Sequence, residues 1–289
     1  MMLRMAGFGI LIICVFGGFV LAGGTLLSLW QPPEIIIILG AAVGAFVISN
    51  SSTVLKMTLT HLKYVLFKNK EFDKHFFMDL LALLFRLIDV RHRKGANAIE
   101  DDIEAPESSE LFQSYQRIMA HPRLVNFITD NLRITGVGNM PGHAFEGLMD
   151  SEIETLENDL KRPAKALQSI ADACPGFGIV AAVMGIVVTM GAMDGPVELI
   201  GMKVAAALVG TFLGILLCYG LFGPLAAAME NTEQSELLAF ECIKMTLMSS
   251  HSGQLPIIAV DSGRRLLFKE LRPTFPEMEA LLQSLKAAT

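Results

Sequence analysis

The sequence predicts an all-α membrane protein with four transmembrane helices, a large helical cytoplasmic insert between spans two and three, and a cytoplasmic C-terminal helix. Three observations lead to this prediction. Four apolar runs are each close to the roughly 20 residues that a helix needs to cross a bilayer. A long, charged segment separates the second run from the third. The composition, 52% hydrophobic and 18% charged, is typical of a membrane protein with a sizeable aqueous part.

The first apolar run, residues 6–29, is uncharged and follows Arg4. A basic start before an apolar stretch also characterises a signal peptide, so cleavage is an alternative. The run is too long for a typical signal peptide, and a second run, residues 35 to about 52, follows a short connector that contains Trp30. A retained first transmembrane helix is therefore favoured.

Between residues 53 and 169 charges become frequent and apolar residues recur at helical spacing, as in FFMDLLALLFRLI. Prolines and the glycine-rich stretch GVGNMPGH divide this insert. Helices are predicted there at about residues 71–90, 108–119, 123–135 and 145–169. After the fourth span, an amphipathic helix is predicted over residues 230–250, an interruption at Pro256, and a last helix from about Thr274.

The third and fourth spans, CPGFGIVAAVMGIVVTMGAM and VAAALVGTFLGILLCYGLFGPLAAAM, are joined by the short connector DGPVELIGMK. Small residues stand four apart in both spans, so that they share one helix face. The pairs are Gly178 and Ala182, Ala181 and Gly185, and Gly210 and Gly214. Such spacing lets helix backbones approach closely in lipid, and it predicts that these two spans pack together.

Basic residues favour the cytoplasmic side of a membrane. Lysines crowd the exit of the second span, whereas the short connectors between spans are mainly acidic. Both termini and the insert are therefore predicted to be cytoplasmic. The expected division is residues 1–55 for spans one and two, 56–168 for the insert, 169–229 for spans three and four, and 230–289 for the C-terminal tail.

Several classes of function find no support in the sequence. The net charge of −6 gives no indication of nucleic-acid binding. No phosphate-binding loop, dinucleotide fingerprint or zinc-protease motif occurs, and the histidines and cysteines lack the spacing of metal ligands. We therefore expect no enzyme, no catalytic residue, no metal site and no cofactor.

The four spans are expected to contain no ionisable side chain, although ion pathways usually depend on such groups. Either the chain moves no ions, or another polypeptide supplies the titrating group. Polar candidates are the side chains of Thr189, Thr211 and Tyr219 and the carbonyls loosened by Pro175 and Pro224. These could face an ion, but simple kinks at the prolines are favoured, as is a Thr211 hydroxyl bonded back to its own helix.

The segment RHRKGANAIEDDIEAPESSE, residues 91–110, places a basic cluster directly before an acidic one. One interpretation is a solvated surface. The other is a docking patch for a partner of complementary charge, where charge fixes register and speeds encounter. The residues themselves leave both open.

The runs CPGFGIVAAVMGIV and ALVGTFLGILLCYGLFGPLA, the stretch IEAPESSELF and the segment EGLMDSEIETLE closely resemble flagellar motor stator subunits of the MotA family. The resemblance covers essentially the whole chain. It implies a lipid-embedded, pentameric ring in the bacterial inner membrane around a dimer of MotB, a peptidoglycan-anchored partner with a single span. In this family, ions pass an aspartate of MotB and drive MotA against the rotor protein FliG.

The resemblance also implies roles for single residues. Pro175 and Pro224 match prolines that couple the ion path to conformational change, and Thr211 matches a threonine that faces this path. Ala182 stands where sodium-driven relatives have threonine, which favours H⁺ over Na⁺ as the transported ion.

Glu100 matches the acidic residue of the rotor contact, while its basic counterpart is one of Arg91, His92 and Arg93. A related alternative is an energiser of the ExbB/TolQ type, although such proteins usually have three spans. A membrane enzyme or scaffold is a further alternative, in which the small residues and prolines would serve packing alone.

Overall fold

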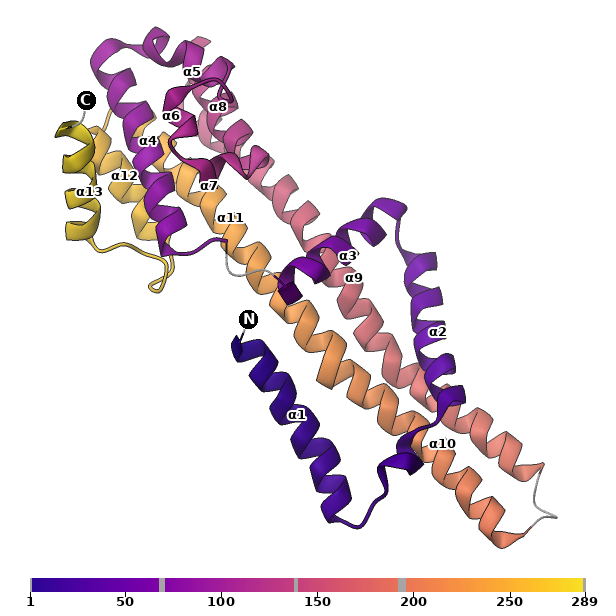
Figure 1. Ribbon diagram of the computed structural model, residues 1–289. Helices are drawn as coiled ribbons and strands as arrows, with labels where there is room; N and C mark the ends of the chain where they lie inside the picture. Colours follow the sequence, from indigo (N-terminus) through magenta and orange to yellow (C-terminus); the bar gives the residue numbers. More distant parts are fainter. Residues whose placement is uncertain (1, 68–70, 138–139, 192–195, 288–289) are drawn as a thin grey trace. The chain divides into compact units, whose positions relative to one another are not determined.

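The computed structural model describes residues 2–67, 71–137, 140–191 and 196–287, and every regular element in them is helical (Figure 1). This confirms the predicted all-α class. The chain divides into two compact units. We call residues 1–69 with 161–231 the membrane unit, and residues 70–160 with 232–289 the helical unit.

Among the described residues, four helical stretches are long and apolar enough to cross a membrane, as predicted. The membrane unit contains two of them completely and parts of the other two. Its elements are α1 (Met2–Leu21), the 3₁₀ helix η1 (Leu26–Leu29), α2 (Pro32–Ser49), α3 (Ser52–Phe67), the second part of α9 (Gly142–Met190), α10 (Val197–Leu217), the π-helical segment η3 (Cys218–Phe222) and the start of α11 (Gly223–His251). Helix α10 packs on α2 and η1.

Two boundaries in the membrane unit differ from those expected. The first helix ends at Leu21 instead of residue 29, because Gly23 adopts a φ of 87° that glycine tolerates and the chain turns there. After α2 ends, the chain forms the additional helix α3, which the sequence analysis missed. Val54, Thr58 and Val65 are buried along it.

The helical unit begins with α4 (Lys74–Lys94), close to the predicted 71–90. Asp73 starts this helix by accepting a 2.8 Å hydrogen bond from the backbone N–H of Phe76. The following elements are η2 (Ala96–Ile99), α5 (Glu100–Glu104), α6 (Glu110–Gln113), α7 (Gln116–Met119), α8 (Pro122–Val137), the first part of α9, the rest of α11, α12 (Pro256–Leu266) and α13 (Phe275–Ala287).

Some predicted helices of this unit were joined or divided wrongly. The predicted helix 108–119 is two short helices, α6 and α7, separated by a turn at Ser114. The hydroxyl of Ser109 caps the start of α6 by accepting a hydrogen bond from the N–H of Phe112. The predicted helix 145–169 is part of α9, which continues to Met190 through Pro163 and Pro175. Pro256 starts the unexpected helix α12, a position where its missing N–H carries no penalty.

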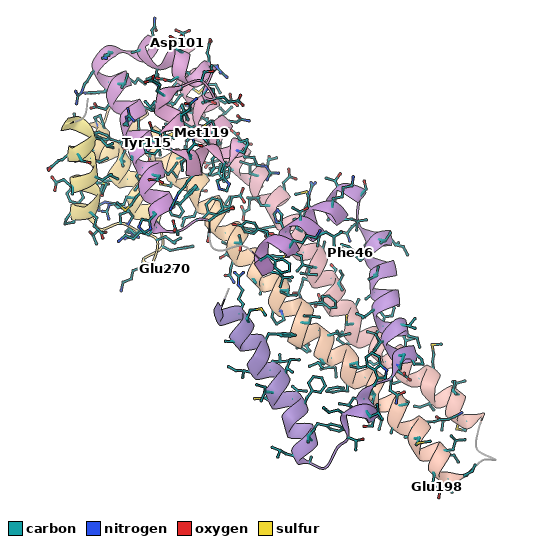
Figure 2. The ribbon with its side chains drawn as sticks, in the orientation of Figure 1. Phe46, Asp101, Tyr115, Met119, Glu198 and Glu270 are labelled. Carbon is teal, nitrogen blue, oxygen red and sulfur yellow. The ribbon has the colours of Figure 1, made fainter. Side chains whose placement is uncertain are left out.

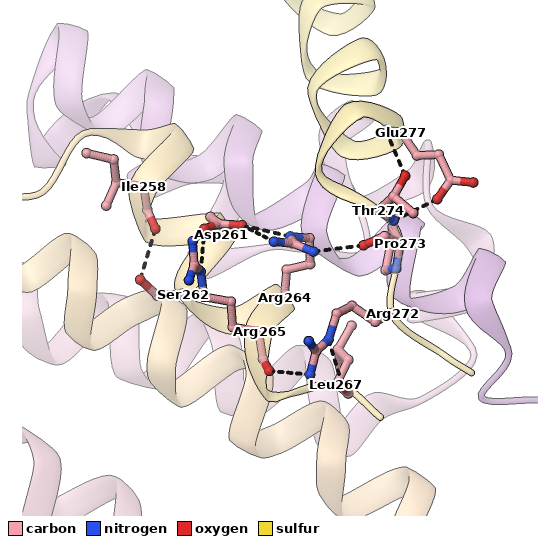
Figure 3. Close-up of polar contacts among 10 residues, drawn as sticks. All are labelled: Ile258, Asp261, Ser262, Arg264, Arg265, Leu267, Arg272, Pro273, Thr274 and Glu277. Atoms are coloured by element: carbon pink, nitrogen blue, oxygen red, sulfur yellow. Dashed lines mark hydrogen bonds and ion pairs between the residues drawn. The ribbon is translucent and has the colours of Figure 1, made fainter. Parts of the chain in front are cut away.

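A large aromatic and aliphatic core holds the helical unit together, with α12 and α13 packed on α4. A polar cluster fastens α12 to the start of α13 (Figure 3). Asp261 accepts 2.7 Å hydrogen bonds from Arg264 and Arg265, and Arg264 donates to the carbonyl of Pro273 at 3.0 Å. Burial disfavours the charge on Asp261, but the two arginines outweigh this effect and hold its pKa below the usual value.

Candidate functional site

A close helix contact in the membrane unit joins α9 and α10, which run side by side in Figure 1. Glycines on both helices leave no room for a side chain. A Cβ added to Gly178 would lie 2.9 Å from the Gly210 oxygen. A Cβ added to Gly185 would lie 2.8 Å from the Ala207 Cβ, and one added to Gly214 would lie 2.6 Å from the Cys174 oxygen. This confirms the packing that the small-residue spacing predicted.

Three of the four predicted ion-path residues border this contact. The backbone nitrogen of Ala182 would lie 3.4 Å from a Cβ added to Gly210, and Thr211 follows that glycine directly. Pro175 follows Cys174, whose carbonyl oxygen faces Gly214. Ala182 thus reaches this seam through its backbone, and Pro175 and Thr211 each stand next to a seam residue in sequence.

Thr189 of α9 and Thr211 of α10 differ in hydrogen bonding. Thr189 is buried and its hydroxyl donates to the carbonyl of Gly185 at 2.8 Å. The half-buried hydroxyl of Thr211 has no hydrogen bond within the part of the chain that the structure describes. The expected bond from Thr211 back to its own helix is therefore absent there, and its hydroxyl is available to another molecule.

The two prolines also differ. Helix α9 passes through Pro175 without a break. Before Pro224, by contrast, the helix widens into the π-helical turn η3, where the N–H of Gly223 donates to the carbonyl of Cys218. A proline ring collides with the carbonyl four residues earlier in a regular helix, and a wider turn relieves that collision. Pro224 itself is exposed and lines an apolar cavity together with Met5 and Phe8 of α1.

Charged side chains in α1, α2 and α10 occur only in the first two turns of each helix, at Arg4, Glu34, Glu198 and Lys203. Glu34 was expected in a connector, but it lies in the first turn of α2 and is only 8% exposed. The preceding Pro32 and Pro33, residues that favour the first helical positions, were the signal for this start.

Many large apolar side chains of the membrane unit are exposed, and Figure 2 shows side chains projecting from its helices. Exposed ones include Val183 and Val187 on α9, Leu208 on α10, and Tyr219, which is 73% exposed. Apolar area of this extent requires lipid or a protein partner to cover it.

In the helical unit, the structure separates the three candidate basic residues of the rotor contact. Arg91 is half-buried, and its guanidinium donates to the hydroxyl of Thr135 at 2.6 Å and to the carbonyl of Thr135 at 3.0 Å. Burial lowers the pKa of Arg91. This residue therefore binds the C-terminal turn of α8, whereas His92 and Arg93 are exposed.

The acidic part of the 91–110 segment folds back next to its basic part. Gly95 adopts a φ of 90°, which lets the chain turn after α4 into η2 and α5. Arg91 and Glu100 then line the same small cavity, of about 120 Å³. Glu100 is exposed at the start of α5, and Asp101 lies beside it at the surface (Figure 2). Exposed charges of both signs thus share one end of the helical unit.

Comparisons with known proteins show the family to which the chain belongs. The model of the motility protein A N-terminal family matches residues 5–95, and that of the MotA/TolQ/ExbB proton channel family matches residues 120–241. Motility protein A of Escherichia coli (strain K12) is 42% identical over 285 residues, which are 99% of this chain and 96% of that protein. The chain belongs to the MotA/TolQ/ExbB proton channel family.

Other members and solved structures extend the comparison. Chemotaxis protein LafT of Vibrio parahaemolyticus is 43% identical over 272 residues, covering 94% of this chain and 95% of that protein. The flagellar MotAB stator complex from Bacillus subtilis matches with a TM-score of 0.70 at 22% identity, over 99% of this chain and 98% of the matched chain. C. jejuni MotAB matches with a TM-score of 0.73 at 19% identity, over 93% of this chain and 97% of the matched chain. The multi-pass helical fold is thus that of the family.

Proposed function

We propose that the chain is a stator subunit of the bacterial flagellar motor. With a MotB partner it forms an ion channel in the inner membrane and converts ion flow into torque on the rotor for motility. The observation that carries this proposal is the α9–α10 seam. Pro175, Ala182 and Thr211 lie at this seam or next to its residues in sequence, beside exposed apolar helix faces, and no charged side chain stands in the middle of either span.

In this mechanism the MotB helix lies along the seam and supplies the titrating aspartate. A carboxylate is costly to charge in a low-dielectric site, so gaining or losing a proton changes how it packs. The membrane potential supplies about 2.3 kcal/mol per charge per 100 mV. In response to that change, α9 bends at Pro175. The continuous helix formed by α10, η3 and α11 bends at the π-helical turn before Pro224. Alanine at position 182 favours H⁺, with Na⁺ as the alternative.

Torque reaches the rotor protein FliG through the exposed charges at the end of the helical unit. His92, Arg93 and Glu100 form that contact, while Arg91 holds α4 to α8. Five copies of the chain surround a MotB dimer, and both termini of each copy are cytoplasmic. The ExbB/TolQ-like alternative is less favoured, since the identity to Escherichia coli motility protein A extends over almost the whole chain.

Complementation of a strain that lacks its stator genes tests the proposal. Cells that express the chain with its MotB partner should swim, should stop in a protonophore, and should continue in an inhibitor of sodium-driven motors. Failure to swim despite membrane insertion of both proteins would contradict the stator role, and arrest by the sodium-motor inhibitor would contradict the choice of H⁺.

Replacement of Pro175 tests the coupling mechanism. Pro175→Ala supplies the backbone N–H that proline lacks, which stiffens the helix at this point, and it should abolish swimming while leaving membrane insertion and assembly with MotB intact. Pro163→Ala is the matched control, because Pro163 lies in the same helix outside the seam. Normal swimming of the Pro175→Ala strain would show that this proline has no coupling role.

A further inference from the structure

An apolar cavity of about 430 Å³ lies within the membrane unit. Three segments line it: the start of α1, the end of α3 and the region around η3 and Pro224. Its volume is within the range of about 300–1,000 Å³ that small-molecule sites in proteins occupy. No residue proposed for the α9–α10 seam lines this cavity.

The cavity exists because α1 packs loosely on its neighbours. None of the apolar stretch of α1 is buried. Gly7 faces the cavity without a side chain, and a Cβ added there would meet no other atom within 4 Å. At the cavity's other wall, a Cβ added to Gly220 would lie 3.3 Å from a methyl carbon of Leu11. The chain's own side chains therefore leave the space open at Gly7.

One cation stands at the cavity. Arg4 is the only charged residue among the described residues that line it. Its Nη1 donates to the carbonyl of Val65 at 2.8 Å, which fixes the guanidinium against the C-terminal turn of α3. A guanidinium has five N–H donors, and no acceptor for the others occurs among the residues that the structure describes. Arg4 thus keeps donors for an external anion.

We propose that this cavity binds an acyl chain of an anionic phospholipid, whose phosphate is held by Arg4. An apolar space beside one fixed cation is complementary to an amphiphile with an anionic head. Guanidinium binds phosphate through paired hydrogen bonds, and basic pockets between transmembrane helices on the cytoplasmic side are suited to anionic lipid heads. A helix from a second copy or from a partner would cover the apolar wall but would leave the donors of Arg4 unused.

The basic residues of α3 agree with this choice of leaflet. Lys56 and Lys63 are exposed on the helix whose end binds Arg4. The cytoplasmic leaflet attracts such residues because it carries the anionic lipids. The inference therefore rests on the cytoplasmic N-terminus of the proposed topology, but it does not depend on torque or on the identity of the transported ion.

Native mass spectrometry of the chain in complex with its MotB partner, purified from membranes, tests the proposal. The wild-type complex should retain one anionic phospholipid per copy of the chain. Arg4→Gln should weaken retention of phosphatidylglycerol about fivefold, the loss expected for one basic group at a membrane surface, and should spare phosphatidylethanolamine. Gly7→Leu fills the cavity and should abolish retention of both.

Two variants separate this site from general effects. Lys63→Gln removes an exposed charge from α3 outside the cavity and should leave the retained lipid unchanged. Gly18→Leu adds the same side chain to α1 about three turns further on, roughly 16 Å along the helix, where an added Cβ also meets no atom within 4 Å. It should likewise leave the retained lipid unchanged.

A photo-crosslinking amino acid in place of Phe8 identifies the occupant directly. Crosslinks to phospholipid support the proposal, and crosslinks to a second copy of the chain or to MotB overturn it. Equal lipid retention by Arg4→Gln, Gly7→Leu and the two controls also overturns it. Because lipid retention is measured without motility, a complex that fails to drive swimming but keeps its lipid would refute the stator role alone.

Discussion

The two units differ in how they cover their apolar side chains. In the helical unit, phenylalanines such as Phe76, Phe112, Phe127 and Phe240 are almost completely enclosed by the unit itself. The buried core of the membrane unit consists largely of smaller side chains, while many of its large apolar residues are exposed. The helical unit has the core of a self-sufficient aqueous domain. The membrane unit has surfaces that only lipid, further copies or a partner can complete.

Glycine at the α9–α10 seam offers the largest test of this difference. Gly214→Val places a side chain against the carbonyl of Cys174, so α9 and α10 must separate. We expect loss of swimming and of proton flow, because the seam that borders the proposed ion-path residues is disrupted. Gly201→Val is the control in the same helix, since a Cβ there meets no atom within 4 Å. Proton flux into vesicles and membrane insertion should be measured for both, and equal flux would refute the proposed importance of the seam.

Gly263 provides the corresponding test in the helical unit. An alanine Cβ at Gly263 would clash with the hydroxyl of Thr246 and with the carbonyl of Cys242, so α12 would be pushed from α11. Overpacking of this kind costs about 1–3 kcal/mol. Gly263→Ala should lower the urea midpoint of the helical unit, measured on the detergent-solubilised chain, whereas proton flux through the assembled complex should fall less than in Gly214→Val. Gly147→Ala, where space is open, should not lower that midpoint.

The two units also differ in how far the sequence predicted them. In the membrane unit, long apolar runs and small residues four apart were sufficient to predict four spans and the α9–α10 seam, because lipid imposes simple length and packing rules. The burial of Glu34 was missed, since hydropathy alone does not show whether an acidic residue beside an apolar run stands before or inside the helix.

Tertiary packing decided what the sequence left open in the helical unit. Arg91, His92 and Arg93 are consecutive on a helix, so their side chains point about 100° apart and only one can reach Thr135. Which of them is internal depends on where α8 lies, and no local pattern contains that information. Helix α12 was missed for a similar reason, because a proline that ends one helix can also begin the next.

Arg91 and Arg93 allow a matched pair of substitutions with smaller effects. Arg91→Ala removes two hydrogen bonds to Thr135 and should cost about 1–3 kcal/mol of stability, the usual value of bonds to a charged group. Arg93→Ala removes only a surface ion pair with Asp89 and should cost less than about 1 kcal/mol. Swimming should nevertheless be impaired by Arg93→Ala if that residue contacts the rotor. Chemical unfolding and swimming speed together distinguish the roles, and equal losses of stability would contradict the assignment of Arg91 as internal.

Reversal of charge in the proposed docking patch separates torque transmission from conduction. Glu100→Lys combined with Arg93→Glu inverts the exposed charges while leaving the Arg91–Thr135 bonds in place. Swimming should be lost because complementary charge fixes the register of the rotor contact. Proton flux through the complex should be retained, since the substituted residues belong to the helical unit. An equal loss of both activities would argue against separate roles for the two units.

The smallest predicted effect is a dependence on pH of the stability of the helical unit. The pKa of Asp261 is lowered in the folded chain, so its contribution to stability is fully present above the unfolded pKa of about 4 and is lost as pH falls through the lower, folded value. Asp261→Asn should destabilise the unit at pH 7, because Arg264 and Arg265 lose their shared carboxylate. The difference from wild type should begin to shrink as the pH falls below about 4, where the carboxylate of the unfolded chain takes up a proton, and should shrink further as the pH approaches the lower, folded pKa. Urea unfolding at pH 7 and pH 3 measures this change, with the exposed Glu270→Gln as the control. A difference that stays constant between the two pH values would show that the Asp261 carboxylate contributes through packing and not through its charge.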